Sequence, residues 1–260
     1  MMDDRPVSPR SSATPAAVPL SLIVFAFNEA ENVTTVLPEI LTWLAGRGAP
    51  FELLFVDDGS RDGTARAARA VLAGRPESEA RVLVHDRNRG IGAALKTGVR
   101  AAHLPWVTFL PCDGQIEPGE LDQLLRARAD QADGADGAGE VALVFSVYLD
   151  RDDGWQRTLL SASIRGLIRT LFGVVMQSDG PYLFRRDLFD ADLLKPDSFF
   201  LNFEFPIRAL RDGRTHRVVT IHCKPRRAGQ SKSTGLRRIS GVARDLVSLR
   251  LRLPPRFRHR

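Results

Sequence analysis

The sequence has few cysteines and no long hydrophobic run. Cys112 and Cys223 are the only cysteines, and they lie far apart, outside any CxxC or Cys/His ligand spacing. Two free thiols in a reducing cytoplasm are therefore expected. No stretch of eighteen apolar residues occurs, so the sequence predicts no membrane-spanning helix. There is no internal repeat, and 260 residues are enough to bury a sizeable core.

The two ends of the chain differ in charge. Residues 1–19 lack the hydrophobic segment of a signal peptide and are predicted to be a disordered leader. From Lys224 onward there are twelve Lys and Arg residues against one acid, Asp245, whereas the rest carries 25 basic and 30 acidic residues. Nucleic-acid binding is disfavoured, because this basic end has no aromatic residue before Phe257.

The predicted tail at 233–260 also has apolar residues close to helical spacing, at Leu236, Ile239, Val242, Leu246 and Leu249. Two interpretations stay open for it. An amphipathic basic helix can lie on an anionic membrane, which would place the protein at the cytoplasmic face. Alternatively, the helix packs on the main domain.

Strand and helix signals alternate along the chain. Short apolar runs predict strands at 20–27, 51–56, 81–85, 106–110, 141–148, 181–186 and 216–223. Helical spacing is found at 30–44, 62–73, 90–102, 118–129, 155–173 and 203–213, with Pro206 in or near the first turn of the last helix. Near-continuous apolar strands separated by helices indicate an α/β fold with a mostly parallel sheet, covered on both faces. We predict one such domain at 20–232.

Polar loops follow the first four predicted strands, at 27–32, 57–64, 85–92 and 111–118. In an open α/β sheet, ligands bind outside the carboxyl ends of the strands, so these loops are the predicted binding site. In the second loop, Asp57 and Asp58 can accept hydrogen bonds from a nucleobase N–H, or they can brace the turn. Asp62 is a candidate N-cap of the next helix.

The third and fourth loops add candidates for binding phosphate and metal. Gly90 and Gly92 precede a helix that contains Lys96, but the full GxGxxG or P-loop spacing is missing. Contact with a diphosphate and a role in helix packing therefore both stay open. Asp113 and Gln115 alternate just past a strand, so both can point to one side. One carboxylate and one amide oxygen, completed by diphosphate oxygens and water, suit Mg²⁺ or Mn²⁺.

With these segments assembled, the chain resembles family 2 glycosyltransferases, in the branch of dolichol-phosphate (polyprenol-phosphate) mannosyl- and glucosyltransferases. The resemblance runs in the family's order from about Ser21 to Lys232, through the motifs FNEAENV, VDDGSRDGT, NRGIGAALKTG, CDGQIEP, SDGPYLFRRDLF, FEFPIRALRDG and RRAGQSK. It implies a GT-A fold, a UDP- or GDP-sugar donor, Mg²⁺ or Mn²⁺, and inversion at the anomeric carbon of a transferred hexose. The implied acceptor is a polyprenyl phosphate.

The resemblance also implies roles for individual residues. The nucleobase and ribose would be held by Phe25, Phe27, Glu29, Asp57 and Asp58. The metal and the diphosphate would be held by Asp113 and Gln115, and Arg157 would lie near the acceptor phosphate. A loop that clamps the charged groups would contain Arg226, Ser231 and Lys232.

Two positions depart from the family's usual pattern. Pro111 stands where an acidic residue is usual, so the metal has one candidate carboxylate fewer. Val147 stands where an arginine is usual, so a phosphorylated acceptor would be held by fewer charges. These departures keep two alternatives open: a soluble family-2-like enzyme that acts on a small-molecule or glycan hydroxyl, and a non-catalytic protein that binds nucleotide sugars.

The acceptor decides whether a general base is needed. A polyprenyl phosphate is ionised near neutral pH and can attack directly, whereas a hydroxyl needs a base within hydrogen-bond reach. Glu204 and Asp179 are the candidate bases. Glu204 lies at the start of a predicted helix, where the helix dipole lowers the basicity of a carboxylate, and it can equally be a residue of the helix terminus.

Overall fold

The computed structural model describes residues 18–129, 141–149, 154–224 and 236–253, without the side chains of 154–161, 236–241 and 243. The predicted leader therefore lies almost wholly outside the described residues. None of the helices in these ranges is both long enough and apolar enough to cross a membrane.

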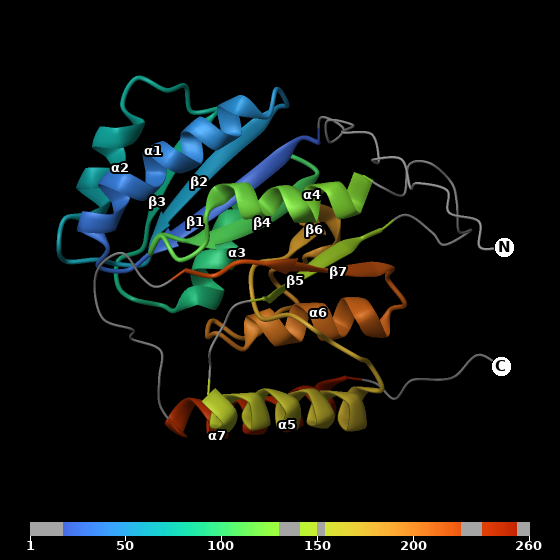
Figure 1. Ribbon diagram of the computed structural model, residues 1–260. Coiled ribbons are helices and arrows are strands. Elements are labelled where there is room, and N and C mark those ends of the chain that lie inside the picture. Colours follow the sequence, from blue (N-terminus) through green and yellow to red (C-terminus); the bar gives the residue numbers. More distant parts are fainter. Residues whose placement is uncertain (1–17, 130–140, 150–153, 225–235, 254–260) are drawn as a thin grey trace, which may run out of the picture.

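A seven-stranded sheet with strand order β3-β2-β1-β4-β6-β5-β7 forms the centre of the molecule (Figure 1). The strands are β1 (Leu20–Ala26), β2 (Phe51–Asp57), β3 (Ala80–Val84), β4 (Trp106–Pro111), β5 (Leu143–Tyr148), β6 (Leu183–Arg185) and β7 (His216–Ile221). Only β6 runs antiparallel to its neighbours, β4 and β5. The predicted mostly parallel sheet is confirmed, and the carboxyl ends of the other six strands share one edge.

Helices cover both faces of the sheet. They are α1 (Ala30–Gly46), α2 (Thr64–Leu72), α3 (Ile91–Ala101), α4 (Leu121–Ala129), α5 (Gly154–Phe172), α6 (Leu201–Arg211) and α7 (Leu236–Arg252), with short 3₁₀ turns at Pro118–Glu120 and Arg186–Leu188. Helices α1, α2 and α4 pack in the core on one face, and α3, α5, α6 and α7 pack in the core on the other. Figure 1 shows α5 and α7 side by side, outside α6.

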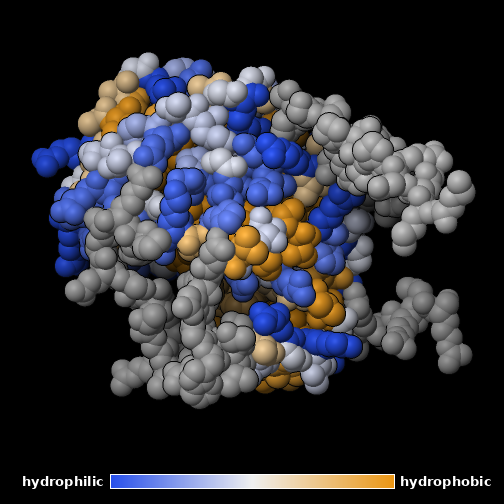
Figure 2. All heavy atoms as spheres, viewed as in Figure 1, coloured by the Kyte–Doolittle hydropathy of each residue, from blue (hydrophilic) through white to orange (hydrophobic). Residues whose placement is uncertain are grey.

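The central strands are buried on both faces, which explains their near-continuous apolar sequence. In β1, Leu22, Ile23 and Val24 are all fully buried, and side chains of both directions meet a helix layer. Burying a Leu or Ile side chain contributes about 1.5–3 kcal/mol, so these strands account for much of the driving force for folding. Three β7 residues, His216, Val218 and Thr220, are exposed instead, at the edge of the sheet. Figure 2 shows hydrophobic surface over this edge of the sheet.

Helix α6 begins earlier than its sequence predicts. The N–H of Leu201 donates to the carbonyl of Ser198, and the helix then runs from Leu201. Pro206 therefore lies inside the helix and not in its first turn, which corrects the prediction. The first turn instead contains Glu204, whose side chain is fully buried.

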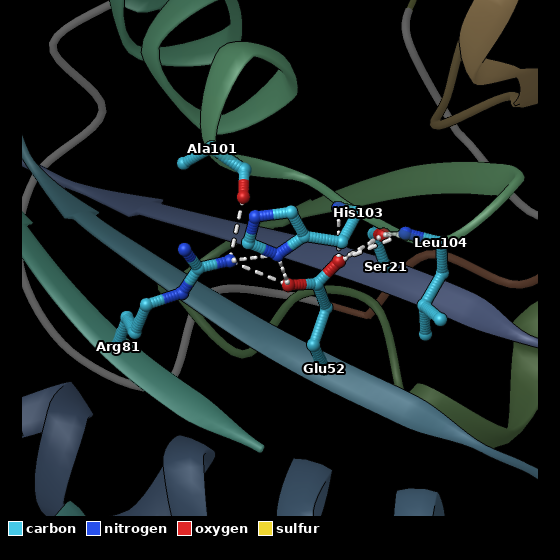
Figure 3. A network of polar contacts seen from close by, with 6 residues as sticks. All are labelled: Ser21, Glu52, Arg81, Ala101, His103 and Leu104. Carbon is cyan, nitrogen blue, oxygen red and sulfur yellow. Dashed lines mark hydrogen bonds and ion pairs between the residues drawn. The ribbon is translucent and has the colours of Figure 1, made fainter. Parts of the chain in front are cut away.

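A buried polar network ties the strands together at the edge opposite to their carboxyl ends (Figure 3). The Oε1 atom of Glu52 accepts hydrogen bonds from the Ser21 hydroxyl at 2.7 Å and from the main-chain N–H groups of His103 at 2.5 Å and Leu104 at 3.1 Å. Its Oε2 atom pairs with Arg81 Nη2 at 2.5 Å. One carboxylate on β2 thereby binds β1, β3 and the loop between α3 and β4.

The hydrogen bonds to Glu52 set the pH dependence of its contribution to stability. Burial alone would raise the pKa of Glu52, but the hydrogen bonds from His103, Ser21, Leu104 and Arg81 together lower it below its usual value. A carboxyl group whose folded pKa is lowered stabilises the fold above its unfolded pKa of about 4.3, and this stabilisation is lost as the pH falls through the folded pKa.

We predict that Glu52→Gln lowers the free energy of unfolding by about 2 kcal/mol at pH 7, because its amide N–H₂ faces the Arg81 guanidinium. Urea unfolding followed by circular dichroism measures this loss. Below about pH 4 the difference between the variant and the parent protein should shrink. Glu77→Gln, an exposed carboxylate near the same edge, is the control and should be neutral. An equal effect of both substitutions would contradict the prediction.

Candidate active site

The first two polar loops interlock at the carboxyl edge of the sheet. Asn28 adopts a left-handed conformation with φ of 53°, and its N–H donates to the Ser60 hydroxyl at 2.8 Å. The Asn28 side-chain oxygen accepts from the N–H of Arg61 at 2.9 Å, and the N–H of Glu29 donates to Thr64 Oγ1 at 2.9 Å. The loop after β1 and the loop after β2 therefore form one connected unit.

Asp62 satisfies the first N–H groups of two helices. Its Oδ1 accepts from the N–H and the hydroxyl of Thr64, and its Oδ2 accepts from the N–H of Ala30, the first residue of α1. Partial burial raises the pKa of Asp62, but the bonds from Thr64 and Ala30 outweigh it and lower the pKa. The predicted N-cap position of α2 is taken by Gly63, one residue later.

The adjacent carboxylates Asp57 and Asp58 are both buried, and each accepts main-chain N–H groups. Asp57 Oδ1 accepts from Ser60 at 3.0 Å. Asp58 accepts from the N–H of Arg89 at 2.9 Å and of Gly90 at 2.8 Å, and its Oδ1 lies 2.7 Å from His85 Nδ1. Asp58 thus connects the loop after β2 to the loop after β3, which is the bracing role that the sequence left open.

Two further acids converge where β1 and β4 end. The N–H of Cys112 donates to the carbonyl of Phe25 at 3.0 Å, so the loops after these strands lie side by side. Burial raises the pKa of the Cys112 thiol, and the negative charges of Glu29 and Asp113 raise it further. Asp113 is itself buried, with Oδ1 accepting from the N–H of Gln115 at 3.1 Å. Two carboxylates, Glu29 and Asp113, therefore lie near the Cys112 thiol at the middle of this edge.

A stretch that the sequence analysis missed lies beside Asp113. The N–H of Lys224 donates to the carbonyl of Gln115 at 2.7 Å, and Gln115 Nε2 donates to the carbonyl of Lys224 at 3.3 Å. The N–H of His222 donates to Glu120 at 2.9 Å, and the Lys224 ammonium pairs with Glu117. The available signal was position, since residues 222–224 directly follow the carboxyl end of β7.

The residues at this edge fit a divalent ion that takes most of its ligands from a bound diphosphate and from water. In the described part of the chain, no three His, Cys, Asp or Glu side chains lie together as a metal site. Asp113 offers one carboxylate, while the Gln115 amide nitrogen is directed to Lys224. Mg²⁺ is commonly bound through one or two carboxylates with substrate phosphates and water, so this donor set suits an ion that arrives with a diphosphate.

Lys96 and Glu204 are both buried, and each is held by ion pairs. Lys96 Nζ is 2.9 Å from Asp197 Oδ1 and donates to the carbonyl of Lys195 at 3.2 Å, which agrees with the packing alternative that the sequence left open. Glu204 Oε1 accepts from Arg208, and Oε2 lies 3.3 Å from Arg252 Nη2 of α7. A fully buried carboxylate held by two arginines is poorly suited to act as a general base.

Three of the remaining predicted residues lie in the part of the chain that the structure describes. Phe25 packs against Phe109 with ring centroids 5.9 Å apart, and Phe27 is half-buried in the first loop. Asp179 is exposed, with its N–H donating to the carbonyl of Ser146 at the end of the sheet. Four predicted contacts lie outside the described residues, at the side chain of Arg157 and at Arg226, Ser231 and Lys232.

A mostly parallel α/β sheet with acidic, interlocked loops at its carboxyl edge is the architecture of the GT-A glycosyltransferases. The family model Glycosyl transferase family 2 matches residues 21–193, and the chain belongs to this family. It is a glycosyltransferase.

A curated relative and two solved structures are similar to the chain. Undecaprenyl-phosphate 4-deoxy-4-formamido-L-arabinose transferase of Edwardsiella ictaluri is 30% identical over 232 residues, 88% of this chain and 67% of that protein. Glucosyl-3-phosphoglycerate synthase of Mycobacterium tuberculosis, solved with Mn²⁺, UDP and phosphoglyceric acid, has a TM-score of 0.65 at 22% identity, covering 93% and 81% of the two chains. Mannosyl-3-phosphoglycerate synthase of Rubrobacter xylanophilus has a TM-score of 0.63 at 16% identity, covering 90% and 73%. These two structures support the fold.

We predict that Asp58→Asn lowers the free energy of unfolding by about 1–3 kcal/mol, because its N–H₂ must face one of the N–H donors from Arg89, Gly90 or His85. Hydrogen exchange should become faster at the amides of Arg89 and Gly90. Asp86→Asn, an exposed carboxylate in the same loop, is the matched control. Unchanged exchange at both amides in the Asp58 variant would show that this carboxylate does not hold the loop.

Proposed function

We propose that the protein transfers a hexose, with inversion, from a UDP- or GDP-sugar to a polyprenyl phosphate. The observation that carries the proposal is the buried Asp113 carboxylate at the carboxyl end of β4, beside the interlocked loops after β1 and β2. The acidic centre of this edge matches a ligand that brings a divalent cation. The 30% identical relative, by its name, acts with undecaprenyl phosphate, which supports the choice of acceptor.

The donor would lie across the first, second and fourth loops. In this proposal Asp57 and Glu29 face the nucleoside, and Asp113 holds Mg²⁺ or Mn²⁺ together with the diphosphate. The bound ion supplies charge compensation for the departing diphosphate. Asp58, Asp62 and Asn28 keep the loops rigid, so that the sugar is held at a fixed distance from the acceptor. Solved structures with this fold contain UDP with Mn²⁺ or Mg²⁺, which supports the cofactor.

The state of Glu204 favours an acceptor that needs no general base. Both of its oxygens are paired with arginines, so it is not free to take a proton from a hydroxyl. A phosphate oxygen is already ionised near neutral pH and can attack the anomeric carbon directly. The exposed Asp179 is the base candidate that remains if the acceptor is a hydroxyl.

The acceptor is tested by incubating the full chain and Mn²⁺ with a panel of UDP- and GDP-hexoses and three acceptors: undecaprenyl phosphate, 3-phosphoglycerate and a disaccharide. Mass spectrometry detects the product and NMR gives its anomeric configuration. We expect transfer to undecaprenyl phosphate with inversion. Transfer only to 3-phosphoglycerate or to the disaccharide would favour the hydroxyl-acceptor alternative, and nucleotide binding without any product would favour the non-catalytic alternative.

Asp113→Asn is the matched variant for this assay. Removing the carboxylate that holds the ion should lower kcat by about 100-fold or more, because the diphosphate loses its charge compensation. Asp187→Asn, at the opposite edge of the sheet, is the control and should retain the parental rate. Turnover of the Asp113 variant at the parental rate would contradict the proposed role.

We also propose that the catalytic domain comprises residues 20–232 and that residues 233–260 form a C-terminal tail. In this proposal α7, within the tail, makes a peripheral contact with the membrane. The described part of α7 has two faces. Leu246 and Leu249 are fully buried in the core beside α6, whereas Val247 and Leu251 are exposed by 49% and 83%. Arg244 is exposed one turn before Val247. The helix thus packs on the domain and still presents apolar and cationic groups outward, as a membrane-surface helix does.

We predict that Leu251→Glu weakens sedimentation of the protein with vesicles of phosphatidylglycerol and phosphatidylcholine by roughly tenfold, because a leucine contributes about 1.5–3 kcal/mol when buried. Leu193→Glu is the matched control, since Leu193 is an exposed leucine outside α7. Equal sedimentation of the two variants would contradict the proposed membrane contact.

A further inference from the structure

The ammonium group of Lys96 is buried in the contact between α3 and the segment that leads into α6. The residue is 7% exposed, and its ammonium binds both Asp197 Oδ1 and the carbonyl of Lys195. The carbonyl of Asp197 in turn accepts from the N–H of Ala93 at 3.1 Å. A buried lysine must be paired to keep its charge, so the contact fixes residues 195–197 against the first turns of α3.

Two glycines allow this close approach. A Cβ atom on Gly90 would lie 2.7 Å from the carbonyl oxygen of Asp197, and one on Gly92 would lie 2.5 Å from that of Ser198. Gly90 also has a φ of +96°, which an L side chain rarely adopts. The glycine-rich loop therefore serves the packing of the backbone of 197–198, the alternative that the sequence left open.

The glycine-rich loop is also bound by the loop after β2. Asp58 accepts the N–H groups of Arg89 and Gly90. Two residues beyond Asp197, the exposed Phe199 begins an aromatic pair with Phe203, and α6 starts at Leu201. A continuous set of contacts thus runs from Asp58 through residues 89–93 to the first turn of α6, at the edge where the donor is proposed to bind.

We propose that Lys96 and Asp197 are a positioning pair, which couples the loop at 85–92 to the first turn of α6 and so sets the position of α6 when a donor nucleotide binds. The inference rests on the proposed function, because it needs a nucleotide at the strand-end loops. It assigns Lys96 to act through Asp197 and not to contact the diphosphate. It follows that the first turn of α6 should become more ordered when a donor nucleotide binds.

The structure supplies a matched control pair between the same two segments. Arg100, one turn after Lys96 on α3, pairs with Asp192 at 2.5 Å. The side chains of Arg100 and Asp192 are 54% and 89% exposed, whereas those of Lys96 and Asp197 are 8% and 50% exposed. Exposed ion pairs contribute little to stability or to rigidity, so loss of Arg100 should leave the coupling intact.

Hydrogen exchange with mass spectrometry tests the coupling without an activity assay. The full chain is compared with Lys96→Met, Asp197→Asn and Arg100→Leu, each alone and with UDP or GDP plus Mn²⁺. In the parent protein we expect the nucleotide to slow exchange at 26–30, 57–60 and 86–90, and at 198–204 by about threefold or more. In Lys96→Met and Asp197→Asn the slowing at 198–204 should disappear while that at 86–90 remains. Arg100→Leu should behave as the parent.

The outcomes separate the inference from the proposed function. If a nucleotide slows 26–30 and 86–90 but not 198–204 in the parent, or if Lys96→Met keeps the full response, the positioning pair is refuted and the donor site stands. If neither nucleotide slows exchange at any of the three loops, the proposed donor site is wrong and the coupling falls with it. Asp197→Asn decides the matter if Lys96→Met fails to fold.

Discussion

The carboxylate of Asp58 is the contact on which the geometry of the site most depends. This buried carboxylate lies at the end of β2. It accepts hydrogen bonds from the N–H groups of Arg89 and Gly90 and contacts His85, so it connects two loops. A buried carboxylate is costly unless such donors surround it, and once they do, it fixes the chain that supplies them. The loop after β3 is therefore positioned by the loop after β2, and the loop after β2 is bound to the loop after β1 through Asn28.

These connected loops leave an acidic centre where β1 and β4 end. Burial raises the pKa of the Cys112 thiol, and the charges of both Glu29 and Asp113 raise it further. Carboxylates gathered at one edge of the sheet suit a divalent cation that arrives with a phosphate-bearing ligand. Glu204 differs from Asp113, because it forms ion pairs with Arg208 and Arg252. We therefore assign Asp113 to the proposed ligand site and Glu204 to a structural role.

Much of the fold was predictable, and the reason lies in the strands. A strand buried on both faces must be apolar throughout, so the runs that became β1, β2 and β4 were visible in the sequence. The positions of Asp57, Asp58 and Asp113 at strand ends followed directly. What could not be predicted was long-range pairing. Lys96 meets Asp197 across 101 residues and Glu204 meets Arg252 across 48, and no local pattern marks either partner.

A crystal structure with Mn²⁺ and UDP or GDP tests the central claim most directly, because the anomalous signal of manganese locates the ion without assumptions about the reaction. We predict one strong anomalous peak within coordination distance of both the Asp113 carboxylate and the diphosphate. The base should lie over the loops that contain Glu29 and Asp57. A nucleotide bound at another edge of the sheet, or a manganese ion bound away from Asp113, would contradict it.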